Sequence, residues 1–371
     1  MKELRLNNRS LWMMRPYTNA DYSQIVILTK SVFNFVEAWI LKEVASGRLT
    51  DKKPLHYWHQ AKHYYEVGTD LRSEVKPLMN YYCCLNTVKC LLSVLGQDVR
   101  NIKHGVSWEK SQNINLDDQK IKFLGVGALK GLRTIIGKDD GEHTFSLKTL
   151  LYNLVVVHRA YVYTFDNEPE IFIPIKSLKF YYRGSTDKIT IAFDLKKDIE
   201  LSVLKTNIPS CFQFTTKSTS DWVKVRDLAI DEKLKWGIEN DKIFFRYKNE
   251  KDWDESKPTP YKQTILTKLH NTLRPYFQYI ISDSPIWYLK KEDNLNPNIL
   301  NYSSTVISYA IMHCLSEMVR YAPDLYKDFL ESEYSWLISE FVEVGMDQFI
   351  DEIASQITGL NIMRSGVKGK C

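Results

Sequence analysis

The sequence lacks the features of a secreted protein, of a membrane-spanning protein and of a protein whose fold is stabilised by a bound metal. It has only six cysteines in 371 residues, and no Cys-x-x-Cys pair occurs, so neither a disulfide framework nor a zinc ribbon is predicted. The amino terminus has no uninterrupted apolar stretch of the kind that a secretory signal needs. The longest uncharged run, residues 294–316, contains Pro297, His313 and several asparagines and serines, which disfavour insertion into a bilayer. We therefore expect a cytoplasmic protein without membrane contact, whose cysteines are reduced core thiols.

Neither sign of charge dominates, and the common catalytic signatures are missing. Fifty Lys and Arg against 45 Asp and Glu give a net charge of +5, too small an excess for composition to name a partner. There is no Gly-x-Ser-x-Gly motif, and no acidic pair stands out as a general acid and base. The glycines within residues 125–131 lack phosphate-loop spacing, which favours a turn. We expect no cofactor.

Helical periodicity occupies both ends of the chain. Apolar residues recur every three or four positions and stop at glycine or proline, as in amphipathic helices. Ser146 is a candidate helix cap, although the β-branched residues 155–157 could turn the end of that helix into strand. The predicted helices cover residues 21–41, 54–67, 78–95 and the front of 145–163, then 307–321, 325–343 and 346–358.

The middle of the chain favours strands. Short β-branched or aromatic segments separated by turn residues predict an antiparallel sheet, with a short helix at 222–230 and a charged loop at 249–260. The predicted strands cover residues 170–183, 188–195, 211–217 and 242–248. The expected fold class is α+β, with N- and C-terminal helices packed with a central antiparallel sheet. Its regions are 1–165 (helical), 166–290 (antiparallel β) and 291–371 (helical), which can also form one composite domain.

Three histidines at His56, His59 and His63 lie within about two helical turns. The spacing of the last two suits a helical metal site. However, the HExxH pattern is absent and four aromatic residues lie between positions 57 and 65, which favours an aromatic packing or binding face. We therefore predict no metal site.

Two polar clusters are better candidates for a binding site. The loop after the third helix carries Arg100, Asn101 and His104, which could hold a phosphate and move a proton. The alternative is that its cations only neutralise a helix C-terminus. On the late helix a polar face ends in Arg320 and Tyr321. This face either meets solvent or lines an inter-helix groove, and Arg320 could equally be a structural arginine. The polar face comprises Tyr309, His313, Ser316 and Arg320.

The segment YYCCLNTVKCLLSVLG with HGVS after it, and the later LSEMVRYAPDLY, resemble the bacterial YaaC-like family. The resemblance pairs an aromatic helix and a His-Gly loop with an Arg-Tyr-x-Pro helix end, and it implies no known activity. It directs attention to the two clusters as one binding surface: Arg100, Asn101, His104, Arg320 and Tyr321.

The N-terminal half is also similar to HEPN helical domains, whose ribonucleases have four to six residues between an arginine and the histidine that follows it. Only three residues separate Arg100 from His104 here, which departs from that rule. The resemblance therefore implies a non-catalytic interaction or binding module in a bacterial antiphage or stress-response assembly. Its partners would be a protein, a second copy of the chain, or RNA or DNA. The alternative is a metal-independent ribonuclease with His104 as acid and base and Arg100 on the phosphate. Whether the protein is an enzyme stays open at this point.

Overall fold

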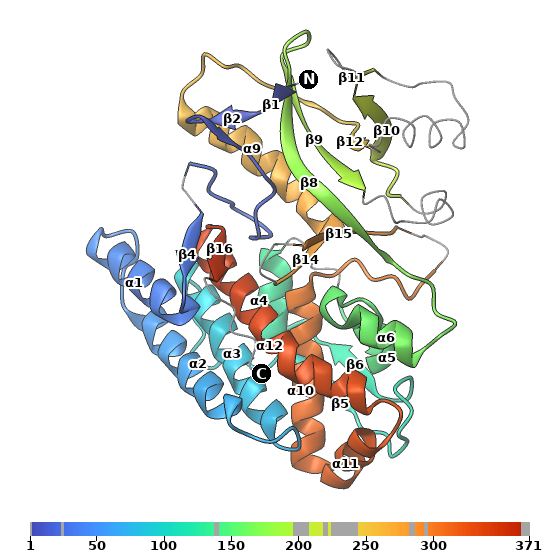
Figure 1. The fold of residues 1–371 in the computed structure, drawn as a ribbon. Coiled ribbons are helices and arrows are strands. Elements are labelled where there is room, and N and C mark those ends of the chain that lie inside the picture. The colour runs from blue at the N-terminus through green and yellow to red at the C-terminus, as the bar shows by residue number, and fades with distance from the viewer. Residues whose placement is uncertain are drawn as a thin grey trace. The chain divides into compact units, whose positions relative to one another are not determined.

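Segments far apart in the sequence come together in each of two units (Figure 1). The computed structural model describes residues 2–23, 26–136, 141–195, 208–217, 222–223, 244–281, 286–292 and 296–364. Unit 1 combines Met1–Ile25 with Glu170–Ile299, and unit 2 combines Val26–Pro169 with Leu300–Cys371. Both ends of the chain contribute helices and the middle contributes an antiparallel sheet, so the predicted α+β class is confirmed.

Unit 1 is built on a nine-stranded antiparallel sheet with the main strand order β11-β10-β12-β9-β8-β15-β14. Apolar residues of its long strands and of helix α9 (Thr259–Leu273) form one core, in which Leu266 and Leu269 are fully buried. All four predicted strand segments lie in this sheet. Its strands are β1 (Lys2–Glu3), β8 (Phe172–Arg183), β9 (Lys188–Leu195), β10 (Phe212–Lys217), β11 (Trp222–Val223), β12 (Phe244–Tyr247), β13 (Lys251–Asp252), β14 (Phe277–Ile280) and β15 (Ile286–Lys290). The short hairpin β2 (Arg5–Leu6) and β3 (Arg9–Ser10) and the turn η2 (Arg274–Tyr276) complete the unit.

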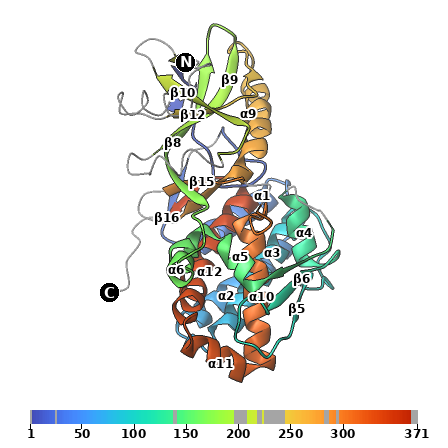
Figure 2. The same ribbon diagram turned by 90° about the vertical axis from the view of Figure 1, so that its right-hand side faces the viewer.

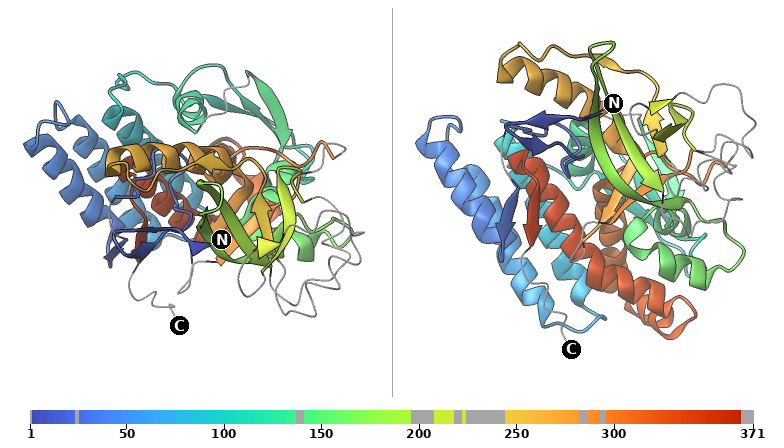
Figure 3. Two further views of the ribbon diagram at one scale, coloured as in Figure 1. Left: turned by 90° about the horizontal axis from the view of Figure 1, so that it is seen from above. Right: turned by 45° about the horizontal axis from the view of Figure 1, so that its top comes forward.

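Unit 2 is a helical bundle in which α3 contacts α2, α10 and α12. Its α10 also packs against a three-stranded antiparallel sheet, as Figure 2 shows. The helices are α1 (Val32–Ala45), α2 (Lys53–Thr69), α3 (Lys76–Val94), α4 (Ala128–Ile135), α5 (Leu147–Tyr152), η1 (Val155–Val157), α6 (His158–Thr164), α10 (Ser304–Tyr321), α11 (Pro323–Glu331) and α12 (Ser335–Thr358). The sheet comprises β5 (Val106–Glu109), β6 (Lys120–Phe123) and β7 (His143–Ser146), and β4 (Ile27–Thr29) pairs in parallel with β16 (Ile362–Arg364), as Figure 3 shows at right.

The predicted helices with the clearest periodicity are confirmed. Helices α2, α3 and α10 match the ranges 54–67, 78–95 and 307–321 within a few residues. Leu85 and Cys314 on the predicted stripes are buried. The Ser146 side chain accepts a hydrogen bond from the Thr149 backbone N–H at 3.1 Å, as a helix cap does. None of the described helices is long and apolar enough to cross a membrane.

Several predicted boundaries are wrong. The first helix does not run through 21–41, because 27–29 form β4 and Ser31 caps α1 at its start. Residues 155–157 form a 3-10 turn and not a strand. The C-terminal break falls between α11 and α12 and not near Gly345, which packs inside α12 where an added Cβ would lie 3.0 Å from the Phe341 ring.

The region between the predicted elements also differs from expectation. The loop predicted at 249–260 contains β13 and the start of α9, a helix missing from the prediction. Of the short helix predicted at 222–230, the first two residues form β11, and residues 224–230 lie outside the described part of the chain. The sheet β5–β7 was not predicted either, since its strands have only four residues each.

Candidate functional site

The polar face predicted on α10 is buried in the groove between α10 and α3. Tyr309 and Ser316 are fully buried and His313 nearly so. Tyr81 of α3 is fully buried as well, and its ring centroid lies 5.7 Å from that of Tyr309 and 4.9 Å from that of His313. Of the two alternatives for this face, the structure therefore shows the inter-helix groove.

The His-Gly loop between α3 and β5 brings His104 to the same groove. Gly105 and Gly127 have φ angles of +81° and +92°, and a Cβ on Gly127 would lie 2.6 Å from the Gly105 nitrogen. Only glycine permits this close approach of two backbone segments. The first N–H groups of α4 then bind the loop, because Ala128 donates to the Lys103 carbonyl at 2.8 Å and Leu129 to the His104 carbonyl at 3.1 Å. These bonds fix the loop backbone against the N-terminus of α4.

Three hydrogen bonds join His104, Tyr81 and Tyr309 into a closed cycle. The Tyr309 hydroxyl donates to the His104 carbonyl at 3.1 Å, the Tyr81 and Tyr309 hydroxyls are 3.3 Å apart, and the Tyr81 hydroxyl contacts His104 Nδ1. The single hydroxyl hydrogen of Tyr309 is used in the bond to the carbonyl, so Tyr309 must accept its second bond from the Tyr81 hydroxyl. The hydrogen of Tyr81 is then used as well, so His104 Nδ1 must carry a proton and donate it to the Tyr81 oxygen. Only this arrangement satisfies all three contacts. We call it the hydrogen-bond cycle, and it leaves the lone pair of neutral His104 on Nε2.

Burial and neighbouring charges lower the pKa of both histidines and so favour their neutral forms. Burial lowers the pKa of His104, and the positive charges of Arg320 and Lys89 lower it further. Burial lowers the pKa of His313 to about 3, with His104 and Arg320 contributing. Burial also raises the pKa of Tyr81, so that this hydroxyl keeps its proton. His104 retains solvent exposure, unlike His313, and is therefore the accessible base of the groove.

Two buried nitrogens of the groove have no hydrogen-bond partner among the described residues: His313 Nδ1 and Arg320 Nε. The other end of the Arg320 guanidinium pairs with the Glu317 carboxylate, and His313 Nε2 lies 4.0 Å from the same carboxylate. Buried polar groups normally have partners. Unused donor capacity at Arg320 beside an accessible histidine is an arrangement suited to an anion. We define the His104 site as Tyr81, Lys89, His104, Tyr309, His313, Glu317 and Arg320.

The structure joins some of the predicted site residues and separates others. His104 and Arg320 belong to one site, since the positive charge of Arg320 acts on both His104 and His313, whose ring centroids lie 5.4 Å apart. Arg100 lies on the surface and binds Asp98 through Nη2 at 2.7 Å, and Asn101 is exposed. Tyr321 is 60% exposed, with its ring centroid 5.2 Å from the Arg320 guanidinium carbon. Tyr81, Lys89 and Glu317 were not predicted. In the sequence, the only signal for this groove was that Tyr309 and His313 lie on one face of the predicted helix.

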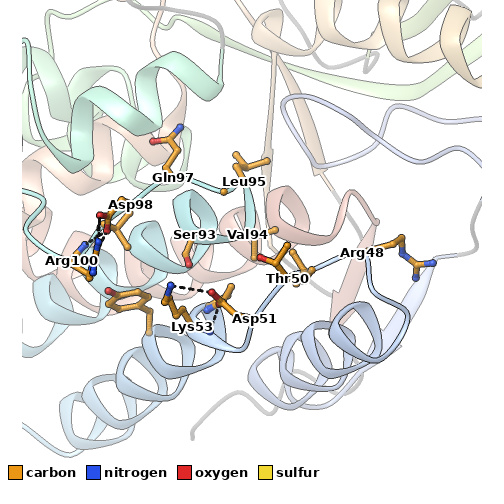
Figure 4. Close-up of a pocket in the computed structure, with 15 residues that line it drawn as sticks. Arg48, Thr50, Asp51, Lys53, Ser93, Val94, Leu95, Gln97, Asp98 and Arg100 are labelled. Carbon is orange, nitrogen blue, oxygen red and sulfur yellow. Dashed lines mark hydrogen bonds and ion pairs between the residues drawn. The ribbon is translucent and has the colours of Figure 1, made fainter.

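Arg100 instead lines a second feature, a hollow of about 490 Å³ between the α1–α2 connection and the C-terminal end of α3 (Figure 4). Lys53 also lines it and pairs with Asp51 at 3.1 Å. The Tyr57 ring forms part of its wall. We call it the α2–α3 hollow.

Metal ligation and thiol chemistry find little support in the described part of the chain. No group of three or more His, Cys, Asp or Glu there could hold a metal ion. His59 pairs with Glu37 at 3.3 Å, while His56 and His63 are exposed. Cys83, Cys84, Cys90 and Cys314 are free and buried, and burial raises the pKa of each thiol, which disfavours the reactive thiolate. Cys371 lies outside the described residues.

The fold and the site define an α+β protein whose helical unit encloses a tyrosine–histidine cluster, with one histidine accessible from solvent. The model of the family described as YaaC-like Protein matches residues 15–357. The chain therefore belongs to the YaaC-like family, as the two motifs predict. Comparisons with curated proteins and with solved structures found no match.

Proposed function

We propose that the protein is a non-catalytic binding module that takes a phosphate group of a nucleic acid at the His104 site. One observation carries the proposal: the two charged neighbours that act on His104, Arg320 and Lys89, are both cations. An anion beside His104 would offset both positive charges and favour protonated His104. Arginine, lysine and protonated histidine are the groups that contact phosphates in nucleic-acid complexes.

The His104 site supports binding better than catalysis because it offers a single accessible base. Cleavage of a phosphodiester by general acid and base needs two groups that exchange protons with the substrate. His313 is buried, and its low pKa leaves it unprotonated near neutral pH. Glu317 is held by Arg320. The wider role, as a component of a bacterial antiphage or stress-response assembly, rests on the likeness of the N-terminal helices to HEPN modules.

The second candidate function is a metal-independent ribonuclease of HEPN type. The hydrogen-bond cycle favours it, because a histidine held in one tautomer with a free Nε2 is prepared to accept a proton. Arg100 does not suit the transition-state role, since its guanidinium pairs with Asp98 outside the His104 site. Arg320 would take that role, and a second copy of the chain would have to supply the acid.

Fluorescence anisotropy with a 5′-labelled uridine octamer tests the proposal. His104→Gln and Arg320→Gln should each weaken binding about ten-fold or more, as expected for loss of a hydrogen bond to a charged group. Lys327→Gln is the matched control, because Lys327 is an exposed cation on α11 that pairs with Glu331 at 3.6 Å. Thermal melts confirm that each variant folds. Equal affinity of all four proteins, or no binding by the wild type to RNA or DNA, would contradict the proposal.

The same proteins separate the two candidate functions. After incubation with the octamer, the binding module leaves the RNA intact. Shorter products that form with wild type and not with His104→Gln would replace the binding module by the ribonuclease.

Binding should also depend on pH with a defined sign. Free His104 has a pKa below its usual value of 6.5, and a bound phosphate raises that pKa, so that binding takes up a proton. The affinity should therefore increase as the pH falls from neutrality through the pKa of His104. In His104→Gln this component should vanish. If the affinity of the wild type does not change with pH, or falls on acidification while that of His104→Gln does not, protonated His104 is excluded as a ligand for the phosphate.

A further inference from the structure

The half-buried seam between α2 and α3 connects the His104 site to the α2–α3 hollow. Lys89, one of the two cations acting on His104, has its ammonium 5.8 Å from the centroid of the Tyr57 ring. Tyr57 in turn lines the hollow. The path from His104 to the hollow therefore runs by way of Lys89 on α3 and Tyr57 on α2, whose side chains are in contact.

Aromatic rings continue along the seam in the other direction. Tyr57 and Tyr64 are seven residues apart on α2, and Tyr82 and Lys89 are seven apart on α3, so each pair shares a helix face. Tyr64 and Tyr82 stack with centroids 5.2 Å apart and planes 24° apart. Each of these four side chains is half-buried, which fixes the ring and leaves part of it accessible.

The ion pairs in the hollow do not prevent an anion from binding there. Its three cations are all paired: Arg48 with Glu43, Lys53 with Asp51 and Arg100 with Asp98. The Arg100–Asp98 pair is largely exposed, with 74% and 64% of the side chains accessible. Such exposed pairs contribute little to stability and are exchanged easily. A phosphate can therefore compete with Asp98 for the Arg100 guanidinium, which presents two donors to either anion.

We infer that the α2–α3 hollow and the Tyr57–Lys89 seam form a second subsite for the same ligand, which is a single-stranded nucleic acid. This inference rests on the proposed function of the His104 site. One phosphate lies at His104 and Arg320, the strand follows Lys89, a base stacks on Tyr57, and a further phosphate reaches Arg100. Cations along a backbone path with aromatic rings beside it are the elements by which proteins bind single strands. In a duplex, the bases are stacked on each other and are not available to Tyr57.

The test compares short and long ligands by competition against a labelled uridine octamer. Wild type should bind the unlabelled octamer at least ten-fold more tightly than uridine monophosphate, which fills only the His104 subsite. A thymidine octamer determines whether RNA and DNA share the site. A double-stranded octamer should compete at least ten-fold less well than the single strand.

Four variants locate the second subsite. Arg100→Gln and Tyr57→Leu should each weaken octamer binding about five-fold or more and leave monophosphate binding unchanged. Asp98→Asn, which removes the competing carboxylate, should tighten octamer binding several-fold. Its matched control Glu331→Gln, which frees Lys327 from the equivalent exposed pair, should have no effect. Arg100→Gln should also reduce the slope of log affinity against log salt by about 0.7.

The outcomes separate the two proposals. Absence of binding by both ligands contradicts the proposed function. Monophosphate binding with no gain for the octamer, equal binding of duplex and single strand, or octamer affinity unmoved by Arg100→Gln, Tyr57→Leu and Asp98→Asn overturns the second subsite and leaves the His104 site standing.

Discussion

The Tyr81→Phe substitution removes one oxygen atom from the centre of the hydrogen-bond cycle. The Tyr81 ring is fully buried and packs edge-on against the ring of His313, and phenylalanine keeps this packing. The variant loses the hydrogen bonds to His104 Nδ1 and to the Tyr309 hydroxyl. Tyr309 still donates to the His104 carbonyl, so the loop keeps its backbone anchor.

The expected loss of stability follows from these two bonds. A hydrogen bond contributes about 0.5–1.5 kcal/mol net, so that Tyr81→Phe should lower the free energy of unfolding by about 1–3 kcal/mol in total. The matched control is Tyr82→Phe, because Tyr82 is the next residue on α3, is half-buried, and keeps its stacking on Tyr64. Urea unfolding followed by circular dichroism measures both variants.

The cycle also fixes the tautomer of neutral His104. With the proton on Nδ1 in the wild type, the ¹⁵N chemical shifts of His104 should show a protonated Nδ1 and an unprotonated Nε2. In Tyr81→Phe the acceptor for Nδ1–H is gone, and the proton should move in part to Nε2. A wild-type His104 protonated on Nε2, together with unchanged stability of Tyr81→Phe, would refute the cycle.

Three further predictions concern residues that pack around the His104 site or are buried in it. Leu85→Ala on the buried stripe of α3 should lower the free energy of unfolding by about 2–5 kcal/mol in urea titrations, and an unchanged value would mean that the stripe is a partner-binding face. Gly127→Ala should destabilise the protein and displace the His-Gly loop, visible as shifted His104 NMR resonances, since its Cβ would lie 2.6 Å from the Lys103 carbonyl oxygen; wild-type resonances would contradict this packing. Finally, His313 has a folded pKa of about 3 and an unfolded value near 6.5, so acidification from pH 6.5 toward 3 protonates only the unfolded chain. Stability should fall by up to about 1.4 kcal/mol per pH unit from this residue, and His313→Leu should flatten the curve, whereas an equal slope in both proteins would show that His313 is protonated in the fold.

The fold was predictable where one local pattern acts alone. Helices α3 and α10 have long uninterrupted stripes and clear ends, and the strands of unit 1 have β-branched and aromatic runs. Helix α9 was missed because Pro258 and Pro260 indicate a loop, although proline is well tolerated in the first turn of a helix. Its buried residues Leu266, Leu269 and Leu273 do follow helical spacing, so that this helix was visible in the sequence.

The site was predictable only in part. The sequence motifs indicate His104 and Arg320, which lie in one site, but they equally indicate Arg100 and Asn101, which do not. Arg100 is only four positions from His104, yet a nearby carboxylate, Asp98, holds its guanidinium on the surface. Which partner an arginine pairs with does not depend on a repeating pattern of residues, so it could not be predicted from the sequence.

By itself, the sequence determined which side chains share a helix face, because the 3.6-residue period of a helix is a local property. It thereby placed Tyr309, His313 and Arg320 together, and it put a glycine beside His104. Only the tertiary structure decided that this face is buried against α3 and that Tyr309 meets a carbonyl 205 residues away. Hydrogen bonds to Tyr81 and Tyr309 set the tautomer of His104, while burial and the positive charges of Arg320 and Lys89 lower its pKa. The physical reason is that the charge state of a group depends on everything that surrounds it in space.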